Sequence, residues 1–197
     1  TNETVKSYAP GSPEKKELKK TIEEIRKIQV DLPMIIGGKE VRTGKMMDIR
    51  PPHDHGHLLG QYHQGDHSHV QMAIDAALAA KPAWEKMHWE SRAAIFLKAA
   101  DLLAGPYRQK MNAITMLGQS KNAFQAEIDC VCELADFFRY NVKNMYEIYH
   151  MQPNSAPGIW NRVNWRPLEG FVWALTTFNF TSIAGNLPSA PALMGNV

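Results

Sequence analysis

The chain has 197 residues, of which 44% are hydrophobic and 21% charged, as expected for one globular domain or two small ones. Its formal net charge of +2 is too small to indicate nucleic acid or a membrane surface as a partner. No apolar run reaches the roughly 18 residues that a membrane-spanning helix needs.

A helix and a hairpin are expected in the first fifty residues. Ser12 before Pro13 is typical of a helix N-cap followed by proline at the first helical position, and apolar residues then recur at helical spacing. Two short apolar runs flank Gly37-Gly38, which predicts a β-hairpin. Residues 46–50 are expected to form a further extended stretch.

Helices are expected through the middle of the chain. Apolar residues recur at helical spacing in four segments between residues 70 and 149. The residues expected at or just beyond the ends of these helices are Pro82, Gly105, Gly118 and Tyr149.

The pattern changes after residue 151. Residues 162–166 alternate like an exposed strand, and residues 170–175 form a continuous apolar run, as in a parallel strand covered on both faces. A segment of small residues after Phe180 predicts a helix. One strand and one helix of an α/β unit, with no parallel partner strand after them, indicate the front part of something longer.

Cysteines and histidines give little sign of a reactive centre. Cys130 and Cys132 point to different sides of a helix, cannot bridge each other and are expected to be buried. In an extended strand, His53, His55 and His57 would share a face and could approach one metal ion. Nearby prolines and a glycine favour a turn with hydrogen-bonded histidines instead, so we expect no metal site. No glycine-rich phosphate-binding motif is present.

Two polar residues stand out among apolar neighbours. Asn179 lies between Phe178 and Phe180 where the expected buried strand stops, and a buried amide costs free energy unless something satisfies it. Its simplest role would be to cap the following helix. Glu133 lies among apolar residues of the longest helix, and composition alone favours its solvated edge over a pocket.

The last thirty residues, LEGFVWALTTFNFTSIAGNLPSAPALMGNV, closely resemble the start of the nucleotide-binding core in the aldehyde dehydrogenase superfamily. The family's proline before Phe-Asn-Phe is Thr177 here. The resemblance covers nearly the whole chain and is specific to the branch that acts on glutamate-γ-semialdehyde. Other matching stretches are PGSPE (10–14), HGH (55–57), AIDAALAAKPAWE (73–85), RAAIFLKAADLLAGPYR (92–108), QAEID (125–129) and ELADFFRYN (133–141).

The resemblance implies an α/β fold. An N-terminal helical and β-hairpin region would lead into the first strand and helix of a Rossmann-like parallel sheet, which this chain would contain incompletely. The expected division is an N-terminal helical arm (1–32), a hairpin with the helical part of the cofactor domain (33–150), a loop and extended strand as a candidate oligomerisation arm (151–168), and the start of the NAD-binding core (169–197).

The resemblance also implies an activity and its site. The reaction would be the NAD-dependent oxidation of glutamate-γ-semialdehyde, formed from Δ1-pyrroline-5-carboxylate, to glutamate in proline catabolism. Asn179 would donate a hydrogen bond to the oxyanion formed when a thiolate attacks the aldehyde. Glu133 and Phe180 would contact the substrate, which reverses the preference from composition for Glu133. The residues whose backbone would line the NAD site are Leu175, Thr176, Thr177 and Phe178.

Neither cysteine matches the family's nucleophile, which we expect beyond Val197. The alternative is a non-catalytic fragment or subunit of a larger assembly that keeps the fold. The resemblance further implies a homodimer or higher homo-oligomer, with a small aldehyde as substrate and no nucleic acid or membrane span. It implies the mitochondrial matrix, or alternatively a bacterial cytoplasm, and leaves NADP open as the cofactor.

Overall fold

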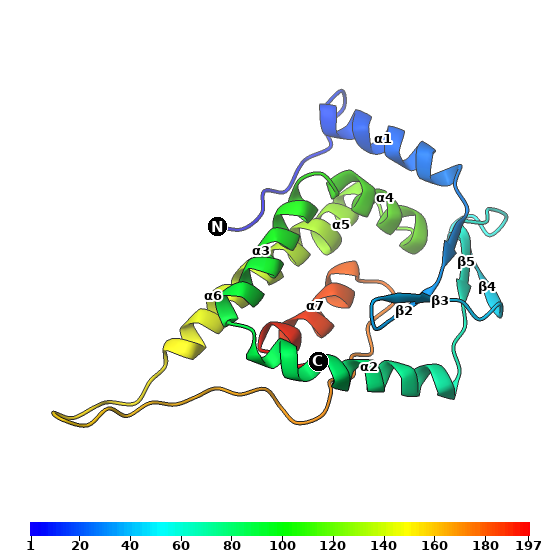
Figure 1. The fold of residues 1–197 in the computed structure, drawn as a ribbon. Helices are drawn as coiled ribbons and strands as arrows, with labels where there is room; N and C mark the ends of the chain where they lie inside the picture. Colours follow the sequence, from blue (N-terminus) through cyan, green and yellow to red (C-terminus); the bar gives the residue numbers. More distant parts are fainter.

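In the computed structural model, which describes residues 1–197, the first helix forms where its capping signals place it. Helix α1 covers Pro13–Arg26, and the Ser12 hydroxyl accepts a hydrogen bond from the Lys15 backbone N–H at 3.3 Å. This bond satisfies one of the N–H groups that a helix start leaves without a partner. The helix lies against α4 (Figure 1). The buried side chain of Leu18 packs there with Tyr8 and Ala113.

Two small sheets follow. Strands β2 (Met34–Ile36) and β3 (Lys39–Val41) form the expected antiparallel hairpin, in which Gly37 and Gly38 supply positive φ values of 58° and 74°. The other sheet has the order β1-β5-β4, with β1 parallel and β4 antiparallel to β5. Its strands are β1 (Val30–Leu32), β4 (Met46–Ile49) and β5 (Gly60–His63). The stretch expected at 46–50 is therefore confirmed, whereas β1 and β5 were not predicted.

Helices make up most of the remaining structure. They are α2 (His67–Lys86), α3 (Trp89–Ala104), α4 (Arg108–Gln119), α5 (Ala123–Ala126), the π-helical turn η1 (Glu127–Cys132), α6 (Glu133–His150) and α7 (Thr181–Leu193). None of them combines the length and the apolar character that crossing a bilayer requires.

Two helix ends differ from the sequence prediction. Pro82 lies inside α2, which continues to Lys86, and the Trp84 indole beyond the proline donates to the Ala192 carbonyl of α7 at 2.8 Å. This hydrogen bond to α7 helps to hold the part of α2 that follows the proline. Gly118 lies inside α4, and Ser120 takes the left-handed conformation that ends this helix, with φ of 57°.

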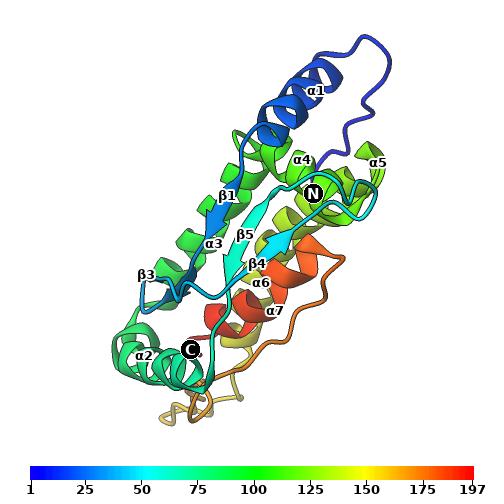
Figure 2. The same ribbon diagram turned by 90° about the vertical axis from the view of Figure 1, so that its right-hand side faces the viewer.

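The core lies where α3, α6 and α7 meet (Figures 1 and 2). The buried side chains of Leu134 and Phe138 on α6 pack against α3. Helix α7 approaches α6 so closely that a Cβ on Gly185 would lie 2.7 Å from Leu134 Cδ1. A residue without a side chain is therefore what lets the two helices pack at this distance.

The strands expected at 162–166 and 170–175 do not form. The only backbone–backbone hydrogen bond of residues 162–175 joins the Val172 N–H to the Val197 carbonyl at 2.6 Å, and the Leu175 side chain is 75% exposed. A parallel strand needs a hydrogen-bonded neighbour, and none lies beside this segment. Residues 151–178 instead extend away from the helices and return to α7 (Figure 1). The helix expected after Phe180 is confirmed as α7.

Candidate functional site

The start of α7 carries the residues that the sequence pattern singled out. Phe180 is the N-cap of this helix and Asn179 precedes it in a turn, half-buried and without a hydrogen bond from its side chain to the rest of the chain. Asn179 therefore does not cap α7, because a capping side chain accepts a hydrogen bond from the first turn. The structure leaves the amide of Asn179 free to bind something else.

Polar contacts hold this end of α7 against α4. The hydroxyl groups of Thr115 and Thr181 lie 3.0 Å apart, and the Gln119 amide donates to the Thr181 hydroxyl, also at 3.0 Å. Thr115 is buried at 1% exposure, so this hydrogen bond is shielded from water. The backbone after Asn179 is thereby fixed on a rigid helix rather than on a loop.

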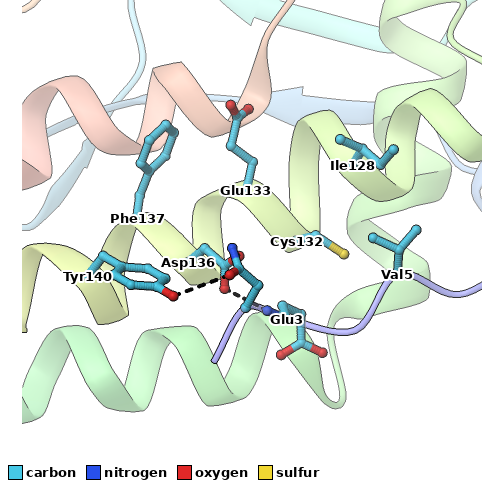
Figure 3. Close-up of a pocket in the computed structure, with 9 residues that line it drawn as sticks. Glu3, Val5, Ile128, Cys132, Glu133, Asp136, Phe137 and Tyr140 are labelled. Carbon is cyan, nitrogen blue, oxygen red and sulfur yellow. Dashed lines mark hydrogen bonds between the residues drawn. The ribbon is translucent and has the colours of Figure 1, made fainter.

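Glu133 faces the same end of α7 from the first turn of α6. Its carboxylate accepts a hydrogen bond from the Ser182 hydroxyl. Figure 3 shows this carboxylate pointing away from Asp136 and Glu3 and toward α7. Glu133 is half-buried, so the solvated helix edge that composition favoured does not describe its position. Glu133 of α6 therefore lies beside the start of α7, where Asn179 and Ser182 are found.

A cavity of about 490 Å³ adjoins Glu133 on the side of the N-terminal segment (Figure 3). The Asp136 carboxylate accepts hydrogen bonds from the Asn2 side chain at 2.8 Å and from the Glu3 backbone at 2.7 Å. The residues that line the cavity are Asn2, Glu3, Val5, Ile128, Cys132, Glu133, Asp136, Phe137 and Tyr140. Its wall thus combines carboxylates with apolar and aromatic side chains.

A buried ionic cluster secures the N-terminal segment beside this cavity. The Glu127 carboxylate is fully buried and pairs with Arg108, while Tyr8 and Asn112 each donate to it at 2.7 Å. Burial alone would raise the pKa of Glu127, but hydrogen bonds from Arg108 and Tyr8 outweigh it and hold the pKa below its usual value. Burial and the adjacent Glu127 raise the pKa of Tyr8. Glu127 is therefore ionised and Tyr8 protonated at neutral pH.

Both cysteines are free and buried, as the sequence predicted. Burial raises the pKa of Cys130, and burial with the nearby Glu127 raises the pKa of Cys132 to about 12. A thiol attacks as its thiolate, which these pKa shifts disfavour at neutral pH.

Of the three neighbouring histidines 53, 55 and 57, only His53 forms a side-chain hydrogen bond, with its Nδ1 atom 2.7 Å from the Ser120 hydroxyl, and the Nε2 atom of His57 is buried without a partner. His63 lies 3.0 Å from the Asp31 carboxylate and accepts from the Thr43 and Gly44 backbone, while His69 closes a capping box with Asp66. No group of three His, Cys, Asp or Glu side chains lies close enough together to hold a metal ion. These contacts give His53, His63 and His69 structural roles at turns and at one helix start.

The segment expected at the cofactor is open. Residues 175–178 form no hydrogen bond within the chain, and Phe178 is 91% exposed. Their N–H and C=O groups are therefore available to a ligand. Sequence reasoning missed the anchors Thr115, Gln119 and Ser182, because they act only across helices. The one local signal was a pair of hydroxyl residues, TS, opening a small-residue helix.

Comparison with known proteins gives consistent matches along the chain. The model of the aldehyde dehydrogenase family matches residues 40–197. A delta-1-pyrroline-5-carboxylate dehydrogenase of Agaricus bisporus is 53% identical over 199 residues, and the mitochondrial delta-1-pyrroline-5-carboxylate dehydrogenase of Homo sapiens is 45% identical over 196. Both alignments cover 100% of this chain, but 36% and 35% of those proteins. The chain thus spans about a third of the length of these relatives.

A solved structure matches the fold equally well. The crystal structure of the delta-pyrroline-5-carboxylate dehydrogenase from Mycobacterium tuberculosis bound with NAD superimposes with a TM-score of 0.97 at 52% identity. The match covers 100% of this chain and 37% of that one. The mixed α/β arrangement described above is therefore that of the N-terminal part of a longer, solved fold.

Proposed function

Because the chain belongs to the aldehyde dehydrogenase family, we propose that it is the N-terminal part of an NAD-dependent enzyme. The enzyme would oxidise glutamate-γ-semialdehyde, formed from Δ1-pyrroline-5-carboxylate, to glutamate in proline catabolism. The relatives that match the whole chain carry the name of this activity. The observation that carries the proposal is the Asn179 amide, which forms no hydrogen bond within the chain. It precedes the start of α7, which hydrogen bonds to α4 and α6 hold in place.

In the proposed reaction, a thiolate outside these residues attacks the aldehyde carbon, and the carbonyl oxygen becomes an oxyanion. The Asn179 amide donates a hydrogen bond to that oxygen. A donor fixed before the reaction stabilises the charge without having to reorganise. NAD would supply the hydride acceptor for the attacked carbon, and hydrolysis of the resulting thioester by water would release glutamate. The backbone of Leu175 to Phe178, which is open to a ligand, would line the cofactor site.

Glu133 and Phe180 would shape the substrate pocket. The ring of Phe180 packs on the aliphatic part of the aldehyde and keeps water from the reacting carbon. Glu133 is positioned for this role by its hydrogen bond from Ser182, which orients its carboxylate toward the start of α7. Both side chains are half-buried, so each keeps an accessible face for a small molecule.

The full-length protein tests this proposal directly. With NAD and the semialdehyde, we expect NADH absorbance to rise in proportion to enzyme, and much less when acetaldehyde, which has neither an amino nor a carboxylate group, replaces the substrate. The rate with NADP in place of NAD shows which of the two cofactors the enzyme prefers. Equal rates with both aldehydes would contradict the substrate assignment, and no NADH with any aldehyde would favour the non-catalytic subunit instead.

We further propose that residues 151–168 contact other protein chains in a homodimer or higher homo-oligomer. Large apolar side chains are exposed there, including Trp160 at 77% and Leu168 at 69%. Exposed apolar patches of this kind mark protein contacts. Light scattering of the full-length protein checks the assembly, and Trp160→Glu should weaken it.

The mitochondrial names of several eukaryotic relatives support the mitochondrial matrix as the compartment, and the Mycobacterium structure supports a bacterial cytoplasm as the alternative.

A further inference from the structure

The ring of Phe180 is covered by a charged side chain that the proposed chemistry does not use. The Lys121 ammonium lies 4.1 Å from the centroid of this ring. It also pairs with the Asp129 carboxylate at 2.9 Å. The side chains of Lys121 and Asp129 are only 11% and 26% exposed, so this ion pair is largely withdrawn from water.

These three residues come from segments that meet only in the folded chain. Lys121 lies in the turn between α4 and α5, directly after the left-handed Ser120 that ends α4. Asp129 belongs to the π-helical turn η1, and Phe180 is the N-cap of α7. The ion pair and the ring contact therefore link the α4–α5 connection, η1 and the start of α7, next to Asn179.

The contact restrains the one freedom that other bonds leave to Phe180. The next residue, Thr181, is already tied to α4 through Thr115 and Gln119, so the backbone is held while the ring could still rotate. A cation over a ring face is attracted by the negative face of the π-system, and more strongly when both are withdrawn from water. Asp129 fixes the ammonium, and the ammonium fixes the ring.

We propose that Lys121, held by Asp129, is a positioning residue for the substrate pocket. It orients the ring of Phe180 against which the aliphatic part of the aldehyde packs, and it steadies the adjoining Asn179 amide. It acts through the ring and touches no substrate. This inference rests on the function proposed above, because it gives the Phe180 ring its task.

Graded fluorination of Phe180 in the full-length enzyme tests the inference. Fluorine withdraws charge from the face of the ring while keeping its shape, so it weakens attraction to a cation. With Lys121 present, kcat/KM for the semialdehyde should fall stepwise with fluorine number, by about 2- to 30-fold in total, the range that a cation–π contact allows. In Lys121→Met the same series should be flat. The Kd for NAD should stay unchanged throughout.

Two variants separate charge from general packing. Lys121→Arg keeps a cation that can lie over the ring and should retain most of the activity. Lys143→Met removes a lysine from an exposed ion pair with Glu147, in which 61% of the Lys143 side chain is exposed, and should match the wild type. Equal slopes in both backgrounds, or wild-type kinetics in Lys121→Met, would overturn the inference.

These experiments also distinguish failure of the proposed function from failure of the positioning role of Lys121. A wild-type protein that oxidises no aldehyde would refute the proposed function itself. An active wild type with no dependence on ring fluorination would refute only the positioning role. If Lys121→Met does not fold, the fluorination series in the native background decides alone, since a flat series there contradicts the proposal.

Discussion

At the scale of single residues, Asn179 is the clearest link between sequence and proposed chemistry. Removing one oxyanion donor costs about 2.7–4 kcal/mol, or roughly a hundred- to a thousand-fold in kcat. Asn179→Ala in the full-length enzyme should therefore lower kcat and kcat/KM together, because the hydrogen bond is made mainly in the transition state. Steady-state kinetics measures both, and the Kd for NAD should change little.

Asn179→Asp provides the sharper comparison. An ionised carboxylate offers no donor and repels the developing negative charge, so this variant should be at least as impaired as the alanine variant. A helix cap, in contrast, accepts Asp and Asn about equally well. The structure already places Phe180 rather than Asn179 at the N-cap. Near wild-type kcat in Asn179→Asp would refute the oxyanion assignment.

The sequence marked some of these residues and missed others for a physical reason. Asn179 and Phe180 stand out locally, because a polar residue between aromatic ones needs an explanation wherever it lies. Glu133 looked solvent-facing from its neighbours alone, and its partner Ser182 lies 49 positions away. Lys121 carries no local signal at all, since its role depends on a ring that only the folded chain brings above it.

At the scale of elements, local rules predicted most helices and the hairpin, because caps, periodicity and a Gly-Gly turn act over a few residues. Non-local pairing decided the rest. Strands β1 and β5 are three and four residues long, and β5 pairs with β1 on one side and with β4 on the other, whereas the apolar run at 170–175 lacks a neighbouring strand and stays irregular. The π-helical turn η1 interrupts a single helical pattern that periodicity alone reads as continuous.

The contact between α6 and α7 gives a prediction at this scale. Gly185→Ala would place a Cβ 2.7 Å from Leu134, which is buried in the core and cannot move aside freely. Overpacking of this kind costs about 1–3 kcal/mol, which exceeds the roughly 1 kcal/mol gained from the better helix propensity of alanine. Thermal or urea unfolding should show net destabilisation.

Gly118→Ala is the matched control for Gly185→Ala. Gly118 also lies inside a helix, but apart from its own helix backbone nothing lies within 4 Å of the added Cβ. Helix propensity should then act alone and stabilise the protein by up to about 1 kcal/mol. If both variants were stabilised equally, the close approach of α7 to α6 would be refuted.

The cluster around Glu127 predicts how stability depends on pH. The folded-state pKa of Glu127 is held below its unfolded value, so the carboxylate stabilises the fold fully above about pH 4.3 and loses this contribution as pH falls through the folded pKa. Breaking such a buried pair costs about 3–5 kcal/mol, so Glu127→Gln should be destabilised at pH 7. It should also lose stability less steeply on acidification.

Urea unfolding at several pH values measures both effects of Glu127→Gln. Glu24→Gln is the control, because the Glu24 side chain is 59% exposed in its ion pair with Lys20. Exposed pairs of this kind contribute about 0–1 kcal/mol, so this variant should follow the wild type at every pH. An unchanged acid profile in Glu127→Gln would contradict the lowered pKa.

At the scale of the whole molecule, the N-terminal segment is held by buried contacts, whereas the segment before α7 is largely exposed. The N-terminal segment is tied down by buried ion pairs of Arg108 with Glu3 and Glu127. Residues 159–178, in contrast, expose large apolar side chains, among them Trp173 at 76% and Phe178 at 91%. Exposed apolar surfaces of this kind are typical of protein contacts, as proposed above for residues 151–168.

The last prediction concerns catalysis by residues 1–197 alone, which we expect to oxidise no aldehyde. Only Cys130 and Cys132 could supply a thiolate, and both are buried. Burial raises the pKa of both thiols, that of Cys132 to about 12, so we expect neither to be a thiolate at pH 7. The purified chain, checked for folding by circular dichroism, is given NAD and the semialdehyde while NADH absorbance is followed, with the full-length protein as the positive control. NADH formation that disappears in Cys130→Ser or Cys132→Ser would place the nucleophile within these residues and refute this view of the site.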